Sequence, residues 1–295
     1  LRFYGSFIAL YAGGGYMIEY NFVSLGAGVQ SSTLSLRFKE LTGKKCDGYI
    51  FADTGFEPKK VYQYLTWLEC KLDPCDDGLF HKCSAPKDGD LKGNILKHTL
   101  AAIKGKTRSY SGVPAYMEKG FIRRQCTSQF KILVIHKKIR DLCGVKPRQK
   151  FPKNKIKVNL YIGISTDEVT RMKPSRVPWI EHKFPLIDHR ISRSDCLRWF
   201  KEQNLPTPAK SACIFCAYHS NSVWLDMKKN SPKEFAMAVK IDKKLRQSKS
   251  TKYPFDVKLY LHPSKKPLDE VDFEKKNKNQ PDLFENHCVE GMCGV

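Results

Sequence analysis

Three apolar segments of this sequence are each followed by a short polar loop and then by a helical pattern. Residues 18–23, 49–52 and 158–162 are rich in β-branched and aromatic side chains, as strands are. After the first loop, Leu34 and Phe38 recur at the spacing of one helix face. Strands that alternate with helices predict an α/β fold with a doubly wound parallel sheet. In such folds ligands bind at the carboxyl ends of the strands.

The loop after the first strand is rich in glycine and serine. Gly26 and Gly28 leave the backbone open to a bound phosphate, and Ser24, Ser31 and Ser32 add hydroxyl donors. The N–H groups at the start of the following helix also favour an anion, because the helix dipole is positive there. No Gly-Lys-Ser/Thr follows, so this is not a Walker loop. The alternative is a purely structural turn between a strand and a helix.

Charged residues follow the other two strands. Asp53 ends the second strand, where a carboxylate accepts a hydrogen bond from a ribose hydroxyl, holds a metal ion, or caps the next helix. Glu168 and Arg171 follow the third strand and suit an acid–base pair acting on a nucleotide, with a surface ion pair as the alternative. The three loops together predict a nucleotide site.

The chain contains eleven cysteines, unevenly spaced. That pattern in 295 residues is not typical of a small disulfide-rich domain, and it predicts a reducing, cytoplasmic setting. Cys213 and Cys216 form a Cys-x-x-Cys motif, and Cys126 lies in a basic segment. Thiolates at this spacing bind zinc or an iron–sulfur cluster, or form a redox disulfide. Four others are expected to be small buried apolar side chains: Cys46, Cys70, Cys143 and Cys196.

Several motifs resemble, in order, those of phosphoadenylyl-sulfate (PAPS) reductases, which belong to the PP-loop superfamily of adenine nucleotide α-hydrolases. Residues 24–31 (SLGAGVQS) resemble the PP-loop, and residues 51–58 (FADTGFEP) resemble the family's DTG…PE segment. Residues 163–171 (GISTDEVTR) resemble its GIRxDES…R segment, and residues 185–195 its PL…WTxxDV segment. The match covers residues 18–225. One departure is Gln30, which stands where the usual SGGxDS loop has an acid.

The resemblance implies a set of site residues. An adenine nucleotide, PAPS or ATP, would bind to residues of the three loops: Ser24, Gly26, Gly28, Gln30, Ser31, Ser32, Asp53 and Gly163. A [4Fe–4S] cluster, or less plausibly zinc, would bind to Cys126, Cys213 and Cys216. The implied catalytic residues are Cys293, Arg171 and Glu168. In the reductases a C-terminal cysteine attacks the sulfur of the nucleotide, and Cys293 resembles that residue, although Met292 replaces the usual acid.

Lysine and arginine exceed aspartate and glutamate by 52 to 30, a net charge of +22. A charge of this size predicts an anionic partner, such as a nucleotide or a nucleic acid, without selecting between them. No apolar run approaches the ~18 residues of a membrane helix, so a membrane is not an expected partner. Hydrophobic residues make up 41% of the chain, which is enough for a packed core and excludes a disordered chain.

The expected organisation has three parts. Residues 1–16 are interpreted as a non-native or disordered leader, with translation starting at Met17. Residues 17–227 form the PP-loop α/β domain, in which residues 73–120, rich in Gly, Lys and Asp, are expected to form a mobile insertion over the site. Residues 228–295 form a basic extension that ends in a cysteine-bearing tail.

Three functions fit these features. The first is a PAPS reductase-like enzyme that works with a thioredoxin-like thiol donor. The second is an ATP-dependent sulfurtransferase that thiolates a nucleic acid with sulfur from a donor. The third is a non-catalytic module that binds a nucleotide or nucleic acid and carries a structural metal. The net charge favours nucleic acid slightly, whereas the tail cysteine favours reduction.

Overall fold

The computed structural model describes residues 7–10, 16–85, 95–103, 112–122, 125–247 and 258–274. In this part of the chain a six-stranded sheet has the order β4-β3-β2-β7-β8, with β1 paired to β2. Its strands are β1 Phe7–Leu10, β2 Tyr16–Leu25, β3 Gly48–Ala52, β4 Phe80–Cys83, β7 Ile156–Ile162 and β8 Ile180–Lys183. All neighbours are parallel except β1 and β2. The three predicted strands are confirmed as β2, β3 and β7.

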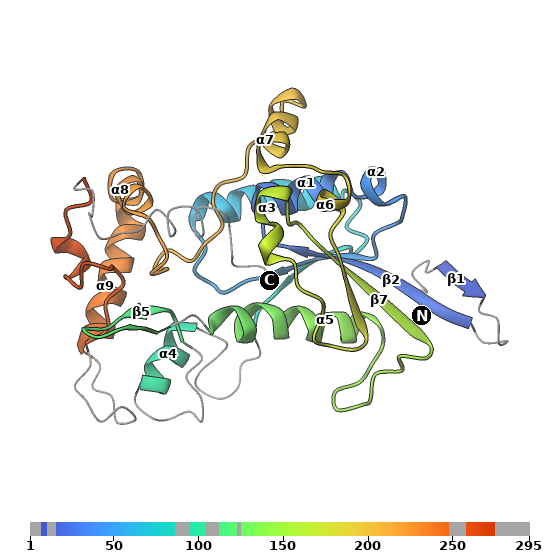
Figure 1. Ribbon diagram of the computed structural model, residues 1–295, viewed down its shortest axis with the longest axis horizontal. Coiled ribbons are helices and arrows are strands. Elements are labelled where there is room, and N and C mark those ends of the chain that lie inside the picture. Colours follow the sequence, from blue (N-terminus) through green and yellow to red (C-terminus); the bar gives the residue numbers. More distant parts are fainter. Residues whose placement is uncertain are drawn as a thin grey trace.

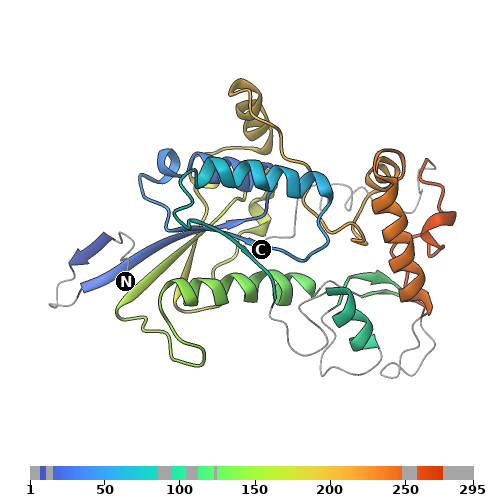
Figure 2. The ribbon, with the colours of Figure 1, turned by 180° about the vertical axis from the view of Figure 1, so that it is seen from behind.

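Helices cover both faces of the sheet (Figures 1 and 2). Helices α1 (Val29–Leu36), α2 (Phe38–Thr42) and α3 (Lys59–Leu72) lie on one face, and α5 (Leu133–Leu142) lies on the other. Side chains of a strand alternate between the faces, so Phe22 joins the apolar cluster on the α5 side and Val23 the cluster with Phe38. The predicted doubly wound α/β fold is confirmed.

The winding reverses between β2 and β7. From β2 the chain moves through α1 and α2 to β3, whereas β7 is reached from α5 on the opposite face. Both strands point the same way, with Ser24 beside Ile162 near their carboxyl ends. Open parallel sheets bind ligands in the crevice at such a reversal. The fold therefore places the expected ligand crevice at the ends of β2 and β7.

Two outer strands do not follow from the sequence pattern. β4 lies within residues 73–120, a stretch that the Gly-, Lys- and Asp-rich composition assigns to an insertion over the site. That assignment is wrong for β4, which pairs with β3 in the sheet. β8 is the strand at the other edge and pairs with β7. Both strands span four residues and are only partly buried, so neither carries the apolar run that marks β3 and β7.

A second group of helices and strands lies at the end of the molecule away from β1 (Figures 1 and 2). It contains α4 Ile95–Ile103, β5 Ala115–Tyr116, β6 Phe121–Ile122, α8 Asn221–Asn230, α9 Pro232–Gln247 and the 3₁₀ turn Leu268–Glu270. The carboxylate of Asp242 is fully buried and accepts hydrogen bonds from the backbone N–H groups of Leu261 and Leu268. The predicted division at residues 227/228 falls inside α8. Trp224 of α8 belongs to the same apolar cluster as Ile135 and Ile139 of α5.

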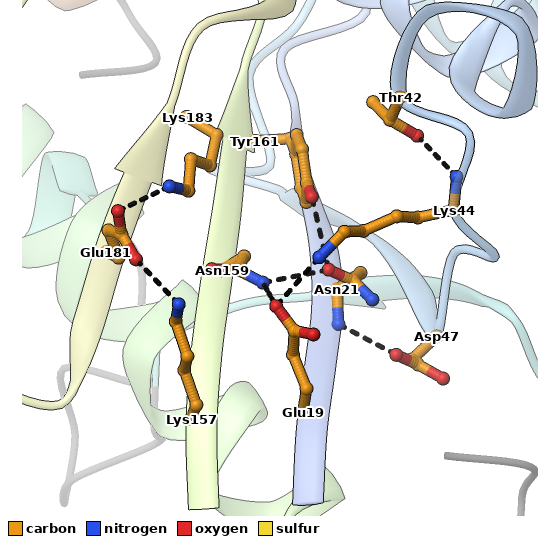
Figure 3. Close-up of polar contacts among 10 residues, drawn as sticks. All are labelled: Glu19, Asn21, Thr42, Lys44, Asp47, Lys157, Asn159, Tyr161, Glu181 and Lys183. Atoms are coloured by element: carbon orange, nitrogen blue, oxygen red, sulfur yellow. Dashed lines mark hydrogen bonds and ion pairs between the residues drawn. The ribbon is translucent and has the colours of Figure 1, made fainter. Parts of the chain in front are cut away.

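A polar network joins β2 and β7 in the middle of the sheet (Figure 3). The amide Nδ2 of Asn159 donates to Asn21 Oδ1 at 3.0 Å and to Glu19 Oε1 at 2.5 Å, and Lys44 Nζ donates to the same Glu19 oxygen at 2.8 Å. Tyr161 Oη donates to Asn21 at 3.2 Å. Burial opposes the charge of Glu19, but the hydrogen bonds from Lys44 and Asn159 outweigh it and lower its pKa. A register slip would leave these buried amides unpaired, so the network specifies how β2 and β7 pair.

No helix in the described part of the chain is long and apolar enough to cross a membrane.

Candidate functional site

The loop that follows β2 makes a tight turn into α1. β2 ends at Leu25 and α1 begins at Val29, so three residues make the connection. Ala27 has a φ of 55°, in the left-handed region that residues other than glycine rarely adopt. Strained backbone of this kind concentrates at functional sites, because the surrounding structure must hold it in place.

The hydroxyl of Ser31 holds this turn together. Its Oγ accepts hydrogen bonds from the backbone N–H groups of Gly26 and Gly28, each at 3.2 Å, and donates to the carbonyl of Gly28. Two N–H groups therefore converge on one oxygen, as they do in backbone nests that bind anions. The first turn of α1 contains no acidic residue that would offset the positive end of the helix dipole. The electrostatics of the turn therefore favour an anion, whereas the N–H groups of Gly26 and Gly28 are engaged by the Ser31 oxygen.

The third loop packs directly against this turn. A Cβ atom on Gly163 would lie 2.6 Å from Ser31 Cα and 2.7 Å from its nitrogen, so only glycine fits there. Gln30, at the position of the usual acid, directs its Nε2 toward Ser165 Oγ at 3.5 Å. Gln30 thus keeps a contact with the neighbouring loop. Ser32 is fully buried in α1.

Asp53 is held from three directions at the end of β3. Its Oδ1 accepts hydrogen bonds from the N–H of Gly55 and from Tyr62 Oη, both at 2.8 Å. Its Oδ2 faces Lys82 Nζ at 3.3 Å, and the same ammonium lies 4.6 Å from the centre of the Tyr62 ring. Burial and the hydrogen bond to Asp53 raise the pKa of Tyr62. Lys82 belongs to β4, a strand that the sequence pattern did not reveal, so this contact was missed.

The Glu168 and Arg171 side chains pair with each other. Both lie in the 3₁₀ helix Thr166–Arg171 that follows β7, and their charged groups form an ion pair. The pair is not a surface one, because the side chain of Glu168 is 1% exposed and that of Arg171 15% exposed. The neighbouring Asp167 accepts a hydrogen bond from the N–H of Arg193 and so fixes the 3₁₀ helix against α7 (Arg193–Glu202).

A cavity of about 380 Å³ opens where the winding reverses. Ser24 and Ile162 line it from the sheet. Residues of α5, among them His136, and of the segment before α5 line the side that faces the sheet. Lys173 and Arg176 line a third side, and no acidic residue is among the lining residues that the structure describes. Burial, and to a smaller degree His182, lower the pKa of His136 to about 4, so its ring is neutral near pH 7. The cavity therefore combines an apolar floor with a cationic rim.

The three cysteines singled out in the sequence border one small cavity. Cys126 comes from the turn before α5, and Cys213 and Cys216 come from the segment between α7 and α8. Thr54, directly after Asp53, lines the same cavity, and its Oγ1 lies 3.1 Å from Cys213 Sγ. Thr54 follows the carboxyl end of β3, and β3 runs parallel to β2. This cavity and the first loop therefore lie at the carboxyl ends of neighbouring strands. The three cysteines thus line one cavity, although they come from distant parts of the chain.

A buried ion pair supports the thiol cavity. Glu57 Oε1 lies 3.5 Å from Lys131 Nζ, and Ser211 Oγ donates to Glu57 Oε2 at 3.1 Å. The side chain of Glu57 is 0% exposed, and that of Lys131, which also lines the cavity, is 9% exposed. Glu57 thus connects the second loop, the π-helix Ser128–Ile132 that leads into α5, and the segment before Cys213. Its place in residues 51–58, which resemble the DTG…PE segment, was the available signal, but its role as a connector depends on distant residues.

His219 holds the Cys-x-x-Cys turn. The ring nitrogen Nε2 of His219 lies 2.9 Å from the carbonyl of Cys213, and the backbone N–H of His219 donates to the carbonyl of Cys216. Burial lowers the pKa of His219 to about 3, and Lys210 contributes in the same direction. The ring is therefore neutral at physiological pH and acts as a hydrogen-bonding support. No pattern in the sequence indicates this role.

The thiol cavity does not have the form of a metal site. Its volume of about 20 Å³ holds about one water molecule. Among the described residues, no group of three or more His, Cys, Asp or Glu side chains is arranged to hold a metal ion. The thiols match a cluster or zinc in their chemistry but not in this geometry. The structure lends no support to a [4Fe–4S] cluster.

The remaining cysteine predictions have different outcomes. Cys46, Cys143 and Cys196 are buried as expected, and burial raises the pKa of each thiol. Cys70 is exposed on α3, so its prediction as a buried side chain is wrong: it lies on the outer face of an amphipathic helix. Cys293 lies outside the described residues.

Comparisons with known proteins find similarity among solved structures. No family model matches the chain, and no curated protein matches it. Among solved structures, the phosphoadenylyl-sulfate (PAPS) reductase from Candida auris, in its phosphate complex, matches with a TM-score of 0.40 and 13% sequence identity. The match covers 64% of this chain and 74% of that chain. At this identity and TM-score the similarity assigns no role to any site residue.

Proposed function

We propose that this chain is a PAPS reductase-like enzyme that binds an adenine nucleotide at the carboxyl ends of β2, β3 and β7. The phosphate side of the nucleotide lies on the turn held by Ser31, and the adenosine enters the cavity beside Ser24. The observation that carries the proposal is that one cavity at the same carboxyl ends is lined by three cysteines, Cys126, Cys213 and Cys216. An anion-binding turn and nearby thiols are what nucleotide-dependent sulfur chemistry requires.

The proposed reaction reduces a sulfonucleotide in two steps. The thiolate of Cys293 attacks the sulfur of PAPS, a bond forms between the two sulfurs, and the bond to the phosphate oxygen breaks, so that adenosine bisphosphate leaves with the electron pair. A thioredoxin-like dithiol then attacks Cys293 Sγ and releases sulfite; its second thiol closes a disulfide and restores Cys293. Arg171, held by Glu168, and the turn of Ser24 and Ser31 stabilise the departing phosphate.

The test is sulfite release from PAPS in the presence of reduced thioredoxin. We expect the Cys293→Ser variant to lose this activity, because the oxygen nucleophile cannot form the thiosulfonate. The matched control is Cys70→Ser, which changes an exposed cysteine on α3 and should retain the wild-type rate. Sulfite release by Cys293→Ser at the wild-type rate would contradict the proposal.

A second candidate is an ATP-dependent sulfurtransferase acting on a nucleic acid. It is favoured by the cationic rim of the Ser24 cavity, formed by Lys173 and Arg176, and by the net charge of +22. There a target oxygen attacks the α-phosphorus of ATP, pyrophosphate leaves, and a sulfur donor displaces AMP. Pyrophosphate release that depends on added RNA or DNA would select this function. Nucleotide binding without either reaction would select a binding module.

The cluster on Cys126, Cys213 and Cys216 stays a prediction, with zinc as its alternative. Binding would require the cavity of about 20 Å³ to open. Iron, zinc and acid-labile sulfide analysis of anaerobically purified protein tests it, with a Cys213→Ser/Cys216→Ser variant as the control. Equal metal content in the two proteins would refute ligation by these thiols. We further expect the protein to work in the cytoplasm, where thiols stay reduced.

A further inference from the structure

An open groove of about 800 Å³ borders the outer strand β8. Its walls are the starts of β2 and β7, the strand β8 itself, and residues 172–179, which lead from the 3₁₀ helix to β8. Four residues line both the groove and the Ser24 cavity: Lys173, Pro174, Ser175 and His182. The carbonyl of Lys173 lies 3.0 Å from His182 Nδ1, which fixes this shared wall. A long ligand in the groove would reach the proposed nucleotide cavity.

The groove is cationic. Lys153, Lys157 and Lys173 line it, and Glu181 is its one acid among the lining residues that the structure describes. Glu181 pairs with Lys157 Nζ at 3.2 Å and also with Lys183, so its charge is already offset (Figure 3). Lys153 and Lys173 are exposed. These side chains attract phosphate groups along the length of the groove.

The same groove contains aromatic side chains. Trp179 lines it and stacks on Phe151 with ring centres 4.2 Å apart and an angle of 15° between the planes. Phe184 also lines the groove, next to the His182 ring at 6.3 Å. Trp179, Phe184 and His182 are partly exposed. Aromatic rings between lysines are typical of surfaces on which bases stack while cations follow the phosphates.

We propose that this groove binds a single-stranded nucleic acid and leads one of its nucleotides toward the Ser24 cavity. A base-paired duplex would offer its phosphates but not its base faces, which are already stacked. An acidic peptide would match the lysines but would not use the aromatic rings. RNA and DNA share the chemistry that the groove recognises. The inference rests on the proposed function only for the destination of the nucleotide, not for binding in the groove.

The test measures fluorescence anisotropy of labelled fifteen-nucleotide strands with the full chain. The groove variant is Lys153→Gln, which removes an exposed charge that is not paired with Glu181 and leaves the Ser24 cavity unchanged. Its control is Lys39→Gln, which removes the same charge from an exposed position on α2, across the sheet. We expect the groove variant to bind about fivefold more weakly at 0.1 M salt, and the slope of log affinity against log salt to fall by roughly 0.7, the loss for one phosphate contact. Separate RNA and DNA strands identify the preferred nucleic acid.

A Trp179→Leu variant tests stacking, with circular dichroism as the measure of folding. If it unfolds, a Phe184→Leu variant takes its place, and either should weaken single strands more than a duplex of the same length. Equal weakening of binding in the groove and control variants would overturn the proposal. So would displacement of the strand by polyglutamate as readily as by unlabelled RNA or DNA, which would indicate an acidic peptide site. Binding of PAPS and ATP is measured on the same protein, so a chain that binds strands but neither nucleotide would refute the proposed function alone.

Discussion

Single residues at this site have two different kinds of role. Ser31 and Gly163 shape the turn: the first gathers two backbone N–H groups, and the second lets the third loop approach within van der Waals distance. Asp53 and Arg171 already have partners, Lys82 and Glu168, which hold them in position. Some residues of the motifs that resemble a nucleotide site therefore have a structural role: they hold the loops in their conformation.

Gly163→Ala should destabilise the protein by about 1–3 kcal/mol, the usual cost of overpacking. The added Cβ would lie 2.6 Å from the backbone of Ser31, so the turn must shift, and nucleotide binding should weaken as well. Urea unfolding and nucleotide titration measure the two effects. Gly28→Ala is the control: its φ is −94° and a Cβ there meets nothing within 4 Å, so stability should hold. A stable Gly163→Ala protein with intact binding would show that the loops do not need this contact.

At the scale of elements, contacts between distant segments hold together the loops at the carboxyl end of β3. Glu57 joins the second loop to Lys131 in the π-helix Ser128–Ile132, which leads into α5, and the N–H of Ile214 donates to the carbonyl of Phe56 at 2.9 Å. The aromatic rings of Phe56 and Phe215 pack edge to face. These contacts bring the Cys-x-x-Cys segment against the end of β3 and so decide where the three thiols lie.

Glu57→Gln should cost about 3–5 kcal/mol, because removing one partner leaves the charge of Lys131 buried without its carboxylate. The free energy of unfolding in urea measures this cost. Reaction of Cys213 and Cys216 with a thiol reagent in the folded protein should also become faster, since the segment loses its support. Glu40→Gln breaks an exposed pair with Arg37, and a cost of about 0–1 kcal/mol is expected there. Equal costs for the two variants would argue against a structural role of Glu57.

At the scale of the whole molecule, the described chain buries several neutral histidines. Burial lowers the pKa of His136 and His262 to about 4, and that of His219 to about 3. In the unfolded chain these groups titrate near 6.5. Between these values the unfolded state binds more protons than the folded state. The stability that the histidines contribute is therefore complete above pH 6.5 and is lost as the pH falls toward 4.

His262→Gln should make stability less dependent on pH in this window. His262 Nε2 lies 2.9 Å from Asn221 Oδ1, and glutamine keeps a polar group there but does not titrate. The slope of the unfolding free energy against pH should fall by up to about 1.4 kcal/mol per pH unit. Asn221→Ala removes the partner without removing a titrating group, so it should lower stability and keep the slope. An unchanged slope in His262→Gln would mean that this histidine is protonated in the folded state.

The local sequence was sufficient for the central strands and for the loops that follow them. β2, β3 and β7 carry apolar runs, and Gly26, Gly28 and Gly163 mark the turns after two of them. These features depend on neighbours along the chain, so spacing and residue type reveal them. The same holds for the pairing of Glu168 with Arg171, three residues away on one helical turn.

Only the tertiary structure decided which distant residues meet. β4 and β8 are short and partly buried, and their place in the sheet comes from pairing with β3 and β7 rather than from their own pattern. Lys82 reaches Asp53, and Lys131 reaches Glu57, because separate segments fold against one another. The closed form of the thiol cavity and the groove along β8 likewise depend on packing between elements. Periodicity along a chain encodes which face of an element is buried, but not which partner buries it.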